Sequence, residues 1–385
     1  MSNLTIEGGN VLFPKRGEIE QTNITVKAGR IESIGAEPAP ETDTRLVAEN
    51  HYVAPGFIDL QVNGAAGVDF LTCDAFGPGQ VGEFLLSHGT TSFLGTIITN
   101  PIETMNDAIG TLTRSNATNM LGLHVEGPFL SPEKRGTHNQ SYLLEPDDDA
   151  FKAITEGFEE EIKLFTFAPE VKRAEQLLKR INTIGAVPSI GHSGASYEET
   201  ISFIDRGISS FTHLFNGMKG FHHREPGTVG AALNSNTFAG LIADGLHLSP
   251  GAVKLADRAK GTGKICLVTD AIAAAGMEDG RYILGDQEIF VEEGLARLDN
   301  GTIAGSTLTL EKAVKNYMEF TGVGLLDAIR TVTLNPARLL SMEEEIGTIG
   351  EASKADLVVL DQSLDVKYTI IGGEVVYKSE NNSRA

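Results

Sequence analysis

The sequence is poor in cysteine: among its 385 residues, only Cys73 and Cys266 occur, far apart and in no spacing typical of a metal site. Two such cysteines argue against a disulfide framework and fit a reducing compartment. No apolar run approaches the roughly 20 residues that span a bilayer. The first residues also lack the basic start and the apolar core of a secretory signal peptide. We therefore expect a cytoplasmic protein that does not enter membranes.

Positive charge is also scarce, because 31 lysines and arginines stand against 52 aspartates and glutamates, for a formal charge of −21. A field of that sign repels nucleic acid and anionic membrane surfaces, so we expect neither as a partner. An anionic substrate would need a local cluster of hydrogen-bond donors. The composition, with 41% hydrophobic and 22% charged residues, is that of a globular protein. The length suits one large domain and a smaller one, at roughly 150 residues per domain.

The middle of the sequence alternates apolar, β-rich runs with segments of helical character, such as residues 170–182 and 197–206. Near-continuous hydrophobic strands separated by helices are typical of a parallel sheet covered on both faces. Eight such runs indicate an α/β fold, a (β/α)8 barrel, rather than an open doubly wound sheet. No Gly-x-Gly-x-x-Gly turn follows any of them, and residues 282–303 resemble a β-hairpin insert instead. The eight runs are 57–63, 91–98, 120–126, 163–168, 187–192, 210–215, 238–244 and 265–270.

Both ends of the chain have a different pattern, in which short alternating runs are separated by turn-forming residues. Neither end could bury a hydrophobic core alone. Together they could form one small β-sandwich. We therefore expect residues 1–54 and 351–385 to make the smaller domain and residues 55–350 to make the barrel.

Polar side chains stand at the ends of four of the barrel runs, where barrel enzymes place their chemistry. Glu126 ends the third run, His192 the fifth and Asp270 the eighth, and His213 lies within the sixth. One carboxylate oxygen and two imidazole nitrogens are three ligands of a catalytic metal site, with the fourth position left for water. Each residue alone has a structural explanation, such as a helix cap for Glu126 or Asp270. Their joint placement at one barrel mouth favours the metal site.

The motifs around these residues resemble those of the amidohydrolase superfamily, most closely the N-acetylglucosamine-6-phosphate deacetylases. The most specific of them is Glu-Gly-Pro-Phe at Glu126, followed twelve residues after that glutamate by His138 in Gly-Thr-His-Asn. The resemblance covers the whole barrel, and the terminal strands fit the second domain of the family. The matching stretches are residues 55–64, 124–129, 136–139, 191–193, 212–218, 244–247, 268–271 and 304–309.

The resemblance implies roles for these residues. Glu126, His192 and His213 would bind a divalent metal, Asp270 would be the catalytic carboxylate, and His138 would hydrogen-bond the acetyl carbonyl. Many relatives carry His-x-His at the end of the first strand, whereas this sequence has Gln61-Val62-Asn63. Amides are poor replacements for imidazole ligands, so we expect one metal ion per subunit. Zinc is the first candidate, and Fe²⁺ or another divalent ion also suits such a site.

The resemblance also implies a small, phosphorylated amino sugar as the substrate and a homodimer as the assembly. The substrate contacts would be Asn216, Gly217, Arg224, His247 and Thr307. Arg224 and His247 would bind the phosphate of the substrate, one of them from across the dimer interface. Judged by chemistry alone, an arginine such as Arg224 is more often a solvated surface charge. The loop at residues 221–226 nevertheless concentrates basic side chains in an acidic protein, which favours the anion-binding role.

The activity that the resemblance implies is metal-dependent hydrolysis of N-acetylglucosamine 6-phosphate to glucosamine 6-phosphate and acetate. Deacetylation of N-acetylgalactosamine 6-phosphate is the nearest alternative, because the two sugars differ at one hydroxyl. Another hydrolase of the superfamily, such as a cyclic amidase or a dipeptidase, is a second alternative. A non-catalytic, structural relative is a third, although such a protein would be expected to lose ligands that this sequence keeps.

Overall fold

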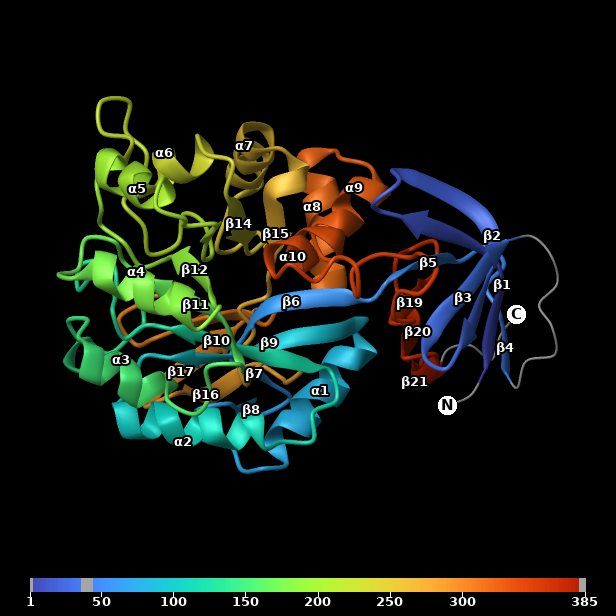
Figure 1. Cartoon of the computed structure of the whole chain (residues 1–385), viewed down its shortest axis with the longest axis horizontal. Helices are drawn as coiled ribbons and strands as arrows, with labels where there is room; N and C mark the ends of the chain where they lie inside the picture. The colour runs from blue at the N-terminus through green and yellow to red at the C-terminus, as the bar shows by residue number, and fades with distance from the viewer. Residues whose placement is uncertain (1–2, 36–43, 381–385) are drawn as a thin grey trace.

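A parallel sheet of eight strands forms the centre of the larger region in the computed structural model, which describes residues 3–35 and 44–380 (Figure 1). Every neighbouring pair is parallel, and the strand order is β15-β14-β13-β12-β11-β10-β9-β6. All eight predicted runs supply one strand each, so the predicted barrel is confirmed. The strands are β6 Phe57–Val62, β9 Thr90–Ile98, β10 Met120–Glu126, β11 Ile162–Phe167, β12 Val187–Ile190, β13 Ser210–Phe211, β14 Phe238–Leu241 and β15 Ile265–Leu267.

The barrel closes at the seam between its first strand, β6, and its last strand, β15. Individual backbone hydrogen bonds join the two there in place of a regular ladder. The backbone N–H of Asp270 donates to the oxygen of Gln61 across 2.9 Å, and that of Asn63 donates to the oxygen of Ala271 across 2.7 Å. A parallel bridge also joins Val62 to Ala271. The residue that follows the eighth strand is therefore fixed directly against the end of the first.

Several strands end earlier than the sequence pattern predicts. Residues His213, Phe215 and Asp270 have φ angles of 33°, 78° and 52°, in the left-handed region that a strand does not adopt. Apolar character continues past these turns because the loops above the strands are buried as well. The apolar pattern of the sequence alone could therefore not distinguish the end of a strand from the buried loop that follows it.

Helices lie between the strands, as predicted, and cover the outside of the sheet. The strand β9 is buried along its whole length, which explains why its sequence is apolar rather than alternating. Local capping fixes several helix starts: at α5, Ser196 and Glu199 form a reciprocal capping box. The helices are α1 Gly77–Ser87, α2 Ile102–Thr113, α3 Asp148–Thr155, α4 Ala174–Thr183, α5 Tyr197–Ile204, α6 Gly227–Leu233, α7 Pro250–Lys260, α8 Leu310–Thr321, α9 Leu325–Arg330 and α10 Leu334–Leu339, with short 3-10 turns η1 Gln140–Tyr142 and η2 Thr262–Lys264.

Two small antiparallel sheets complete the barrel region. The predicted insert is a three-stranded meander whose apolar side chains form a small core together with Ile98 and Ile272 of the barrel. Its first turn, at Gly285 and Asp286, is one that the sequence pattern did not reveal. The strands are β16 Gly280–Leu284, β17 Gln287–Glu292 and β18 Leu295–Arg297 in the meander, and β7 Gly64–Ala65 and β8 Val68–Asp69 in the other sheet.

The two ends of the chain meet in a second sheet beside the barrel, where blue and red strands lie side by side (Figure 1). The order is β21-β20-β19-β5-β1-β2-β3, with β4 paired to β1, around a separate hydrophobic core. The predicted sheet-rich terminal region is thus confirmed. Its exact bounds stay a prediction, and residues 1–2, 36–43 and 381–385 of it lie outside the described residues. The strands are β1 Leu4–Phe13, β2 Glu18–Lys27, β3 Arg30–Gly35, β4 Thr44–Val47, β5 Tyr52–Pro55, β19 Leu357–Leu360, β20 Val366–Ile371 and β21 Glu374–Lys378.

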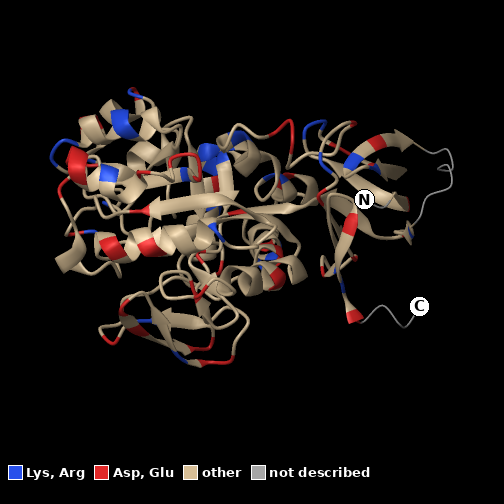
Figure 2. Cartoon of the chain, turned by 60° about the horizontal axis from the view of Figure 1, so that its bottom comes forward, with Lys and Arg blue, Asp and Glu red and all other residues tan. Residues whose placement is uncertain are grey.

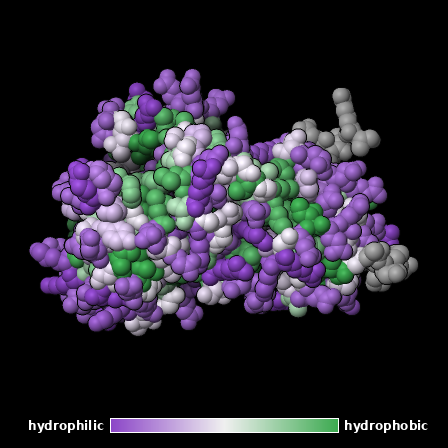
Figure 3. Space-filling model, turned by 90° about the horizontal axis from the view of Figure 1, so that it is seen from above, coloured by the Kyte–Doolittle hydropathy of each residue, from purple (hydrophilic) through white to green (hydrophobic). Residues whose placement is uncertain are grey.

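The surface agrees with the acidic composition. Acidic and basic residues are interspersed along the barrel and the terminal sheet (Figure 2). The face seen in Figure 3 is mainly hydrophilic, with hydrophobic residues scattered between the polar ones. Among the described residues, no helix has the length and apolar character needed to cross a membrane.

Candidate functional site

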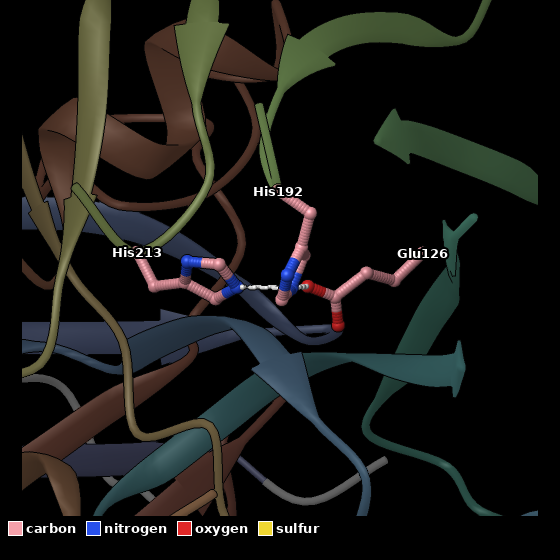
Figure 4. Close-up of side chains that lie close together, drawn as sticks. All are labelled: Glu126, His192 and His213. Carbon is pink, nitrogen blue, oxygen red and sulfur yellow. Dashed lines mark hydrogen bonds and ion pairs between the residues drawn. The ribbon is translucent and has the colours of Figure 1, made fainter. Parts of the chain in front are cut away.

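Glu126, His192 and His213 point toward one another at the barrel mouth, as Figure 4 shows. The Nε2 atoms of His192 and His213 lie 3.1 and 2.9 Å from Oε1 of Glu126. The two Nε2 atoms are 3.0 Å apart. All three side chains are buried, and one potential ligand atom of each lies within 4.8 Å of the others. The structure therefore brings the predicted metal ligands together.

The hydrogen bonds around this cluster fit a divalent metal ion. The Nδ1 atom of His192 lies 2.9 Å from the backbone oxygen of Lys134, which can only accept, so Nδ1 carries the hydrogen and Nε2 presents its lone pair. One carboxylate and two imidazoles are a donor set typical of catalytic zinc.

Backbone strain accompanies this arrangement. His192 and His213 have φ angles of 48° and 33°, which a non-glycine residue adopts only where its surroundings enforce it. Gly217 has a φ angle of 59°, and a Cβ atom there would lie 2.7 Å from Nδ1 of His192. A glycine is therefore required at this position for the ligand ring to take its place.

His138 lies beside the cluster, with its Nε2 atom 3.2 Å from Nε2 of His192 and 4.0 Å from Oε1 of Glu126. The backbone N–H of Thr99 donates to Nδ1 of His138 across 3.3 Å. Burial, and then the neighbouring His192, lower the pKa of His138 to about 3. The ring is therefore neutral with its hydrogen on Nε2, a donor directed into the site.

Asp270 faces the cluster from the barrel seam. Asn63 Nδ2 and Gln61 Nε2 donate to its Oδ1 atom across 2.7 and 3.1 Å. Burial, and then the charge of Glu126, raise the pKa of Asp270 to about 6. The residues directly after Asp270 and directly after Glu126 lie in loops rather than in helices. The alternative that either residue caps a helix is therefore wrong.

A cavity of about 270 Å³ opens over these residues. The insert contributes one wall through Leu284, Thr302 and Ile303, and Gln287 of the same insert donates to the backbone oxygen of Thr137, beside His138. The predicted residues that line the cavity are Glu126, His138, His192, His213, Asn216, Gly217, His247 and Asp270.

Two of the predicted substrate contacts do not line this cavity. Arg224 is exposed in the loop before α6, where its guanidinium lies 3.0 Å from Nε2 of His223. Thr307 donates from its hydroxyl to the backbone oxygen of Gly294 across 3.0 Å. Neither is among the described residues that line the cavity. Both assignments stay predictions.

The structure adds residues that the sequence pattern did not single out. Asp244 Oδ2 lies 2.6 Å from Nδ1 of His247, and its Oδ1 accepts from the backbone N–H groups of Leu246 and His247 across 2.8 Å. Glu170 accepts a hydrogen bond from the hydroxyl of Ser193 across 2.9 Å, next to His192. The Asp-Gly turn before His247 was a sequence signal for the role of Asp244. Nothing in the sequence pointed to Glu170.

His124, whose role the sequence left open, lies inside the barrel beneath the site. Its Nε2 atom is 2.7 Å from the hydroxyl of Thr166, which is 2.6 Å from that of Thr212, the residue before His213. Burial lowers the pKa of His124 to about 4, so the ring is neutral. His124 therefore supports the strand that carries a candidate ligand and does not itself join the cluster.

Comparison with known proteins agrees with this geometry. Residues 52–376 match the amidohydrolase family. N-acetylglucosamine-6-phosphate deacetylase from Homo sapiens is 37% identical over 391 residues, covering 96% of this chain and 95% of the relative. N-acetylgalactosamine-6-phosphate deacetylase from Escherichia coli O157:H7 is 32% identical over 370 residues, covering 94% and 97%.

A solved structure gives the same result. A mutant of N-acetyl-D-glucosamine-6-phosphate deacetylase from Mycobacterium smegmatis, in complex with N-acetyl-D-glucosamine-6-phosphate, superposes with a TM-score of 0.92. The two sequences are 30% identical, and the match covers 98% of this chain and all of the other. The chain therefore belongs to the amidohydrolase family, and within it to the N-acetylglucosamine-6-phosphate deacetylases.

Proposed function

We propose that this chain hydrolyses the acetamide of N-acetylglucosamine 6-phosphate, with one water consumed and glucosamine 6-phosphate and acetate released. The observation that carries the proposal is the convergence of Asp270 and His138 on the Glu126–His192–His213 cluster within one cavity. Amide hydrolysis needs a nucleophile, stabilisation of a developing negative charge and a proton for the leaving nitrogen. These residues can serve all three needs.

One divalent metal ion per subunit, with zinc as the first candidate, would be held by Glu126, His192 and His213. Such an ion lowers the pKa of a bound water from 15.7 toward about 7. The amides of Gln61 and Asn63 direct their nitrogens at carboxylates, which speaks for one metal rather than two.

Asp270 would take the proton of the attacking water and deliver it to the sugar nitrogen as the C–N bond breaks. His138 would donate from Nε2 to the acetyl oxygen while that oxygen gains negative charge. Its neutral ring suits this role, because the N–H group donates a hydrogen bond without giving up its proton.

The phosphate would be bound by donors at the cavity rim. Asn216, Gly217 and His247 line the cavity, and the turn at Gly217 lets backbone N–H groups approach an anion closely. Arg224 is exposed, so we propose a homodimer in which Arg224 of one subunit reaches the site of the other. Thr307 would contact the sugar.

The remaining assignments are also proposals. The smaller domain would comprise residues 1–54 and 351–385, and the barrel residues 55–350. The two cysteines favour the cytoplasm, since Cys266 is buried and Cys73 half-buried without a disulfide. Deacetylation of N-acetylgalactosamine 6-phosphate is the second candidate activity, supported by the relative with that name.

The test is acetate release from N-acetylglucosamine 6-phosphate by chelator-stripped protein, before and after addition of zinc. We expect release only after zinc is restored. The galacto sugar is run in parallel, and a higher kcat/KM for that sugar would favour the second candidate. No release from either sugar, with zinc demonstrably bound, would contradict the proposal.

A further inference from the structure

We infer that Asn63, together with Gln61, is a positioning residue that decides which oxygen of Asp270 takes the proton. The inference rests on the proposed function, because it concerns the proton transfer of that reaction. Both amide groups donate to the same oxygen, Oδ1, across 2.7 and 3.1 Å. The hydrogen bonds of the described residues leave Oδ2 of Asp270 for the reaction.

An oxygen that accepts two N–H groups has its lone pairs directed at hydrogens and is a poor site for a further proton. The proton from water therefore bonds to Oδ2 as the water oxygen bonds to the acetyl carbon. It moves from Oδ2 to the sugar nitrogen as the C–N bond breaks, and Asp270 returns to its carboxylate form. The backbone is held as well, because the N–H of Asp270 donates to Gln61 and its oxygen accepts from Ser306 across 2.9 and 2.8 Å.

The other end of the Asn63 side chain supports the same conclusion. Its Oδ1 atom is buried and has no hydrogen-bond partner among the described residues, although Asn63 lines the cavity and is only 5% exposed. Turning the amide over would set this oxygen against Oδ1 of Asp270, and two acceptors repel. The amide is therefore held with its nitrogen toward Asp270.

We call the two amide hydrogen bonds to Oδ1 of Asp270 the clamp. Gln61 extends this clamp to the candidate metal ligand Glu126. Its Nε2 atom has two hydrogens, and it lies 3.1 Å from Oδ1 of Asp270 and 3.3 Å from Oε2 of Glu126. One neutral amide thus separates the buried carboxylate of Glu126 from the half-buried carboxylate of Asp270 and fixes one oxygen of each. Oε1 of Glu126 is left for the metal and Oδ2 of Asp270 for the proton.

The test replaces Asn63 by leucine, which has a similar volume but no donor or acceptor, in the zinc-loaded full chain. We expect kcat for acetate release to fall about 10–100-fold, as when a partner of a metal-site residue is removed, with KM and zinc content nearly unchanged. Gln61→Met should behave similarly. The double variant should lose less than the product of the two effects, because both amides act on one oxygen. Asn63→Ser replaces Asn63→Leu if the latter does not fold.

Asn335 offers a matched control. It is also fully buried, its Oδ1 also has no partner among the described residues, and its Nδ2 donates to the backbone oxygens of Thr262 and Ile265 across 2.8 and 2.7 Å. It lies at the opposite end of β15 from Asp270. Asn335→Leu should lower Tm and leave kcat unchanged.

A second measurement does not depend on activity. In zinc-loaded protein labelled with ¹⁵N at asparagine, the side-chain amide of Asn63 should exchange slowly with solvent, and Asp270→Ala should shift its resonance and speed the exchange. An unchanged resonance in Asp270→Ala would overturn the clamp. So would a kcat of Asn63→Leu within about twofold of the wild type, or one that falls only in proportion to lost zinc. If the wild-type chain releases no acetate, the proposed function fails, whereas the clamp is still decided by the amide resonance.

Discussion

The hydrogen bond from Nδ1 of His192 to the backbone oxygen of Lys134, 2.9 Å long, decides which ring nitrogen faces Glu126. A carbonyl can only accept, so the lone pair of the ring is on Nε2 and is directed at the cluster. Lys134 lies 58 residues earlier in the chain, in the loop that also carries His138. The loop that carries the proposed oxyanion donor, His138, therefore also sets the tautomer of the candidate metal ligand His192.

Removing a ligand should remove the metal. Glu126→Ala or His192→Ala leaves two of the three candidate ligands. We expect most of the zinc to be lost on dialysis, as measured by elemental analysis. His51→Ala, outside the barrel, should keep it. Equal zinc in all three variants would show that the metal binds elsewhere.

Replacing Asp270 by asparagine should separate metal binding from turnover. An amide cannot take up the proton of the water, although its oxygen can still accept from Asn63 and Gln61. We expect the zinc content of the wild type and a loss of kcat of at least about 100-fold. Retained activity would remove Asp270 from the mechanism.

His138→Ala should lower kcat by about 100–1,000-fold with zinc retained, because a buried donor to the developing oxyanion is lost. Steady-state kinetics with zinc-loaded protein measures this effect. If KM rises while kcat stays constant, His138 binds the ground state of the substrate instead.

Arg224→Ala should raise KM far more for N-acetylglucosamine 6-phosphate than for free N-acetylglucosamine, since the guanidinium would contact only the phosphate. Comparing kcat and KM for the two sugars tests this. Arg206→Ala, another exposed arginine, should leave both unchanged. Equal effects of Arg224→Ala on both sugars would assign Arg224 to the solvated surface.

Asp244→Asn should weaken substrate binding through His247. The carboxylate accepts from Nδ1 of His247 and thereby fixes the orientation of the ring that lines the cavity. We expect KM for the phosphorylated sugar to rise about 10-fold or more, by analogy with other orienting partners of histidine. A double-mutant cycle with His247→Asn should be strongly non-additive. Additive effects would mean that the two residues act independently.

The sequence by itself determined the barrel and the candidate ligands. Apolar runs of strand length separated by helical segments are local patterns, and strand-end residues such as Glu126 and His192 must meet at one mouth once the barrel closes. The apolar pattern failed where buried loops continue a strand, as at His213 and Asp270, and it missed the turn at Gly285 and Asp286.

The tertiary structure alone decided how the site is supported. Asn63 and Asp270 are separated by 207 residues, and their contact depends on the seam that joins the first and last strands. The sequence marked Gln61 and Asn63 only as poor ligands, because the direction of an amide depends on the partner that faces it. Similarly, no local pattern places Lys134 against His192 or Glu170 against Ser193. Side-chain contacts between distant segments follow from the closed barrel rather than from the spacing of residues.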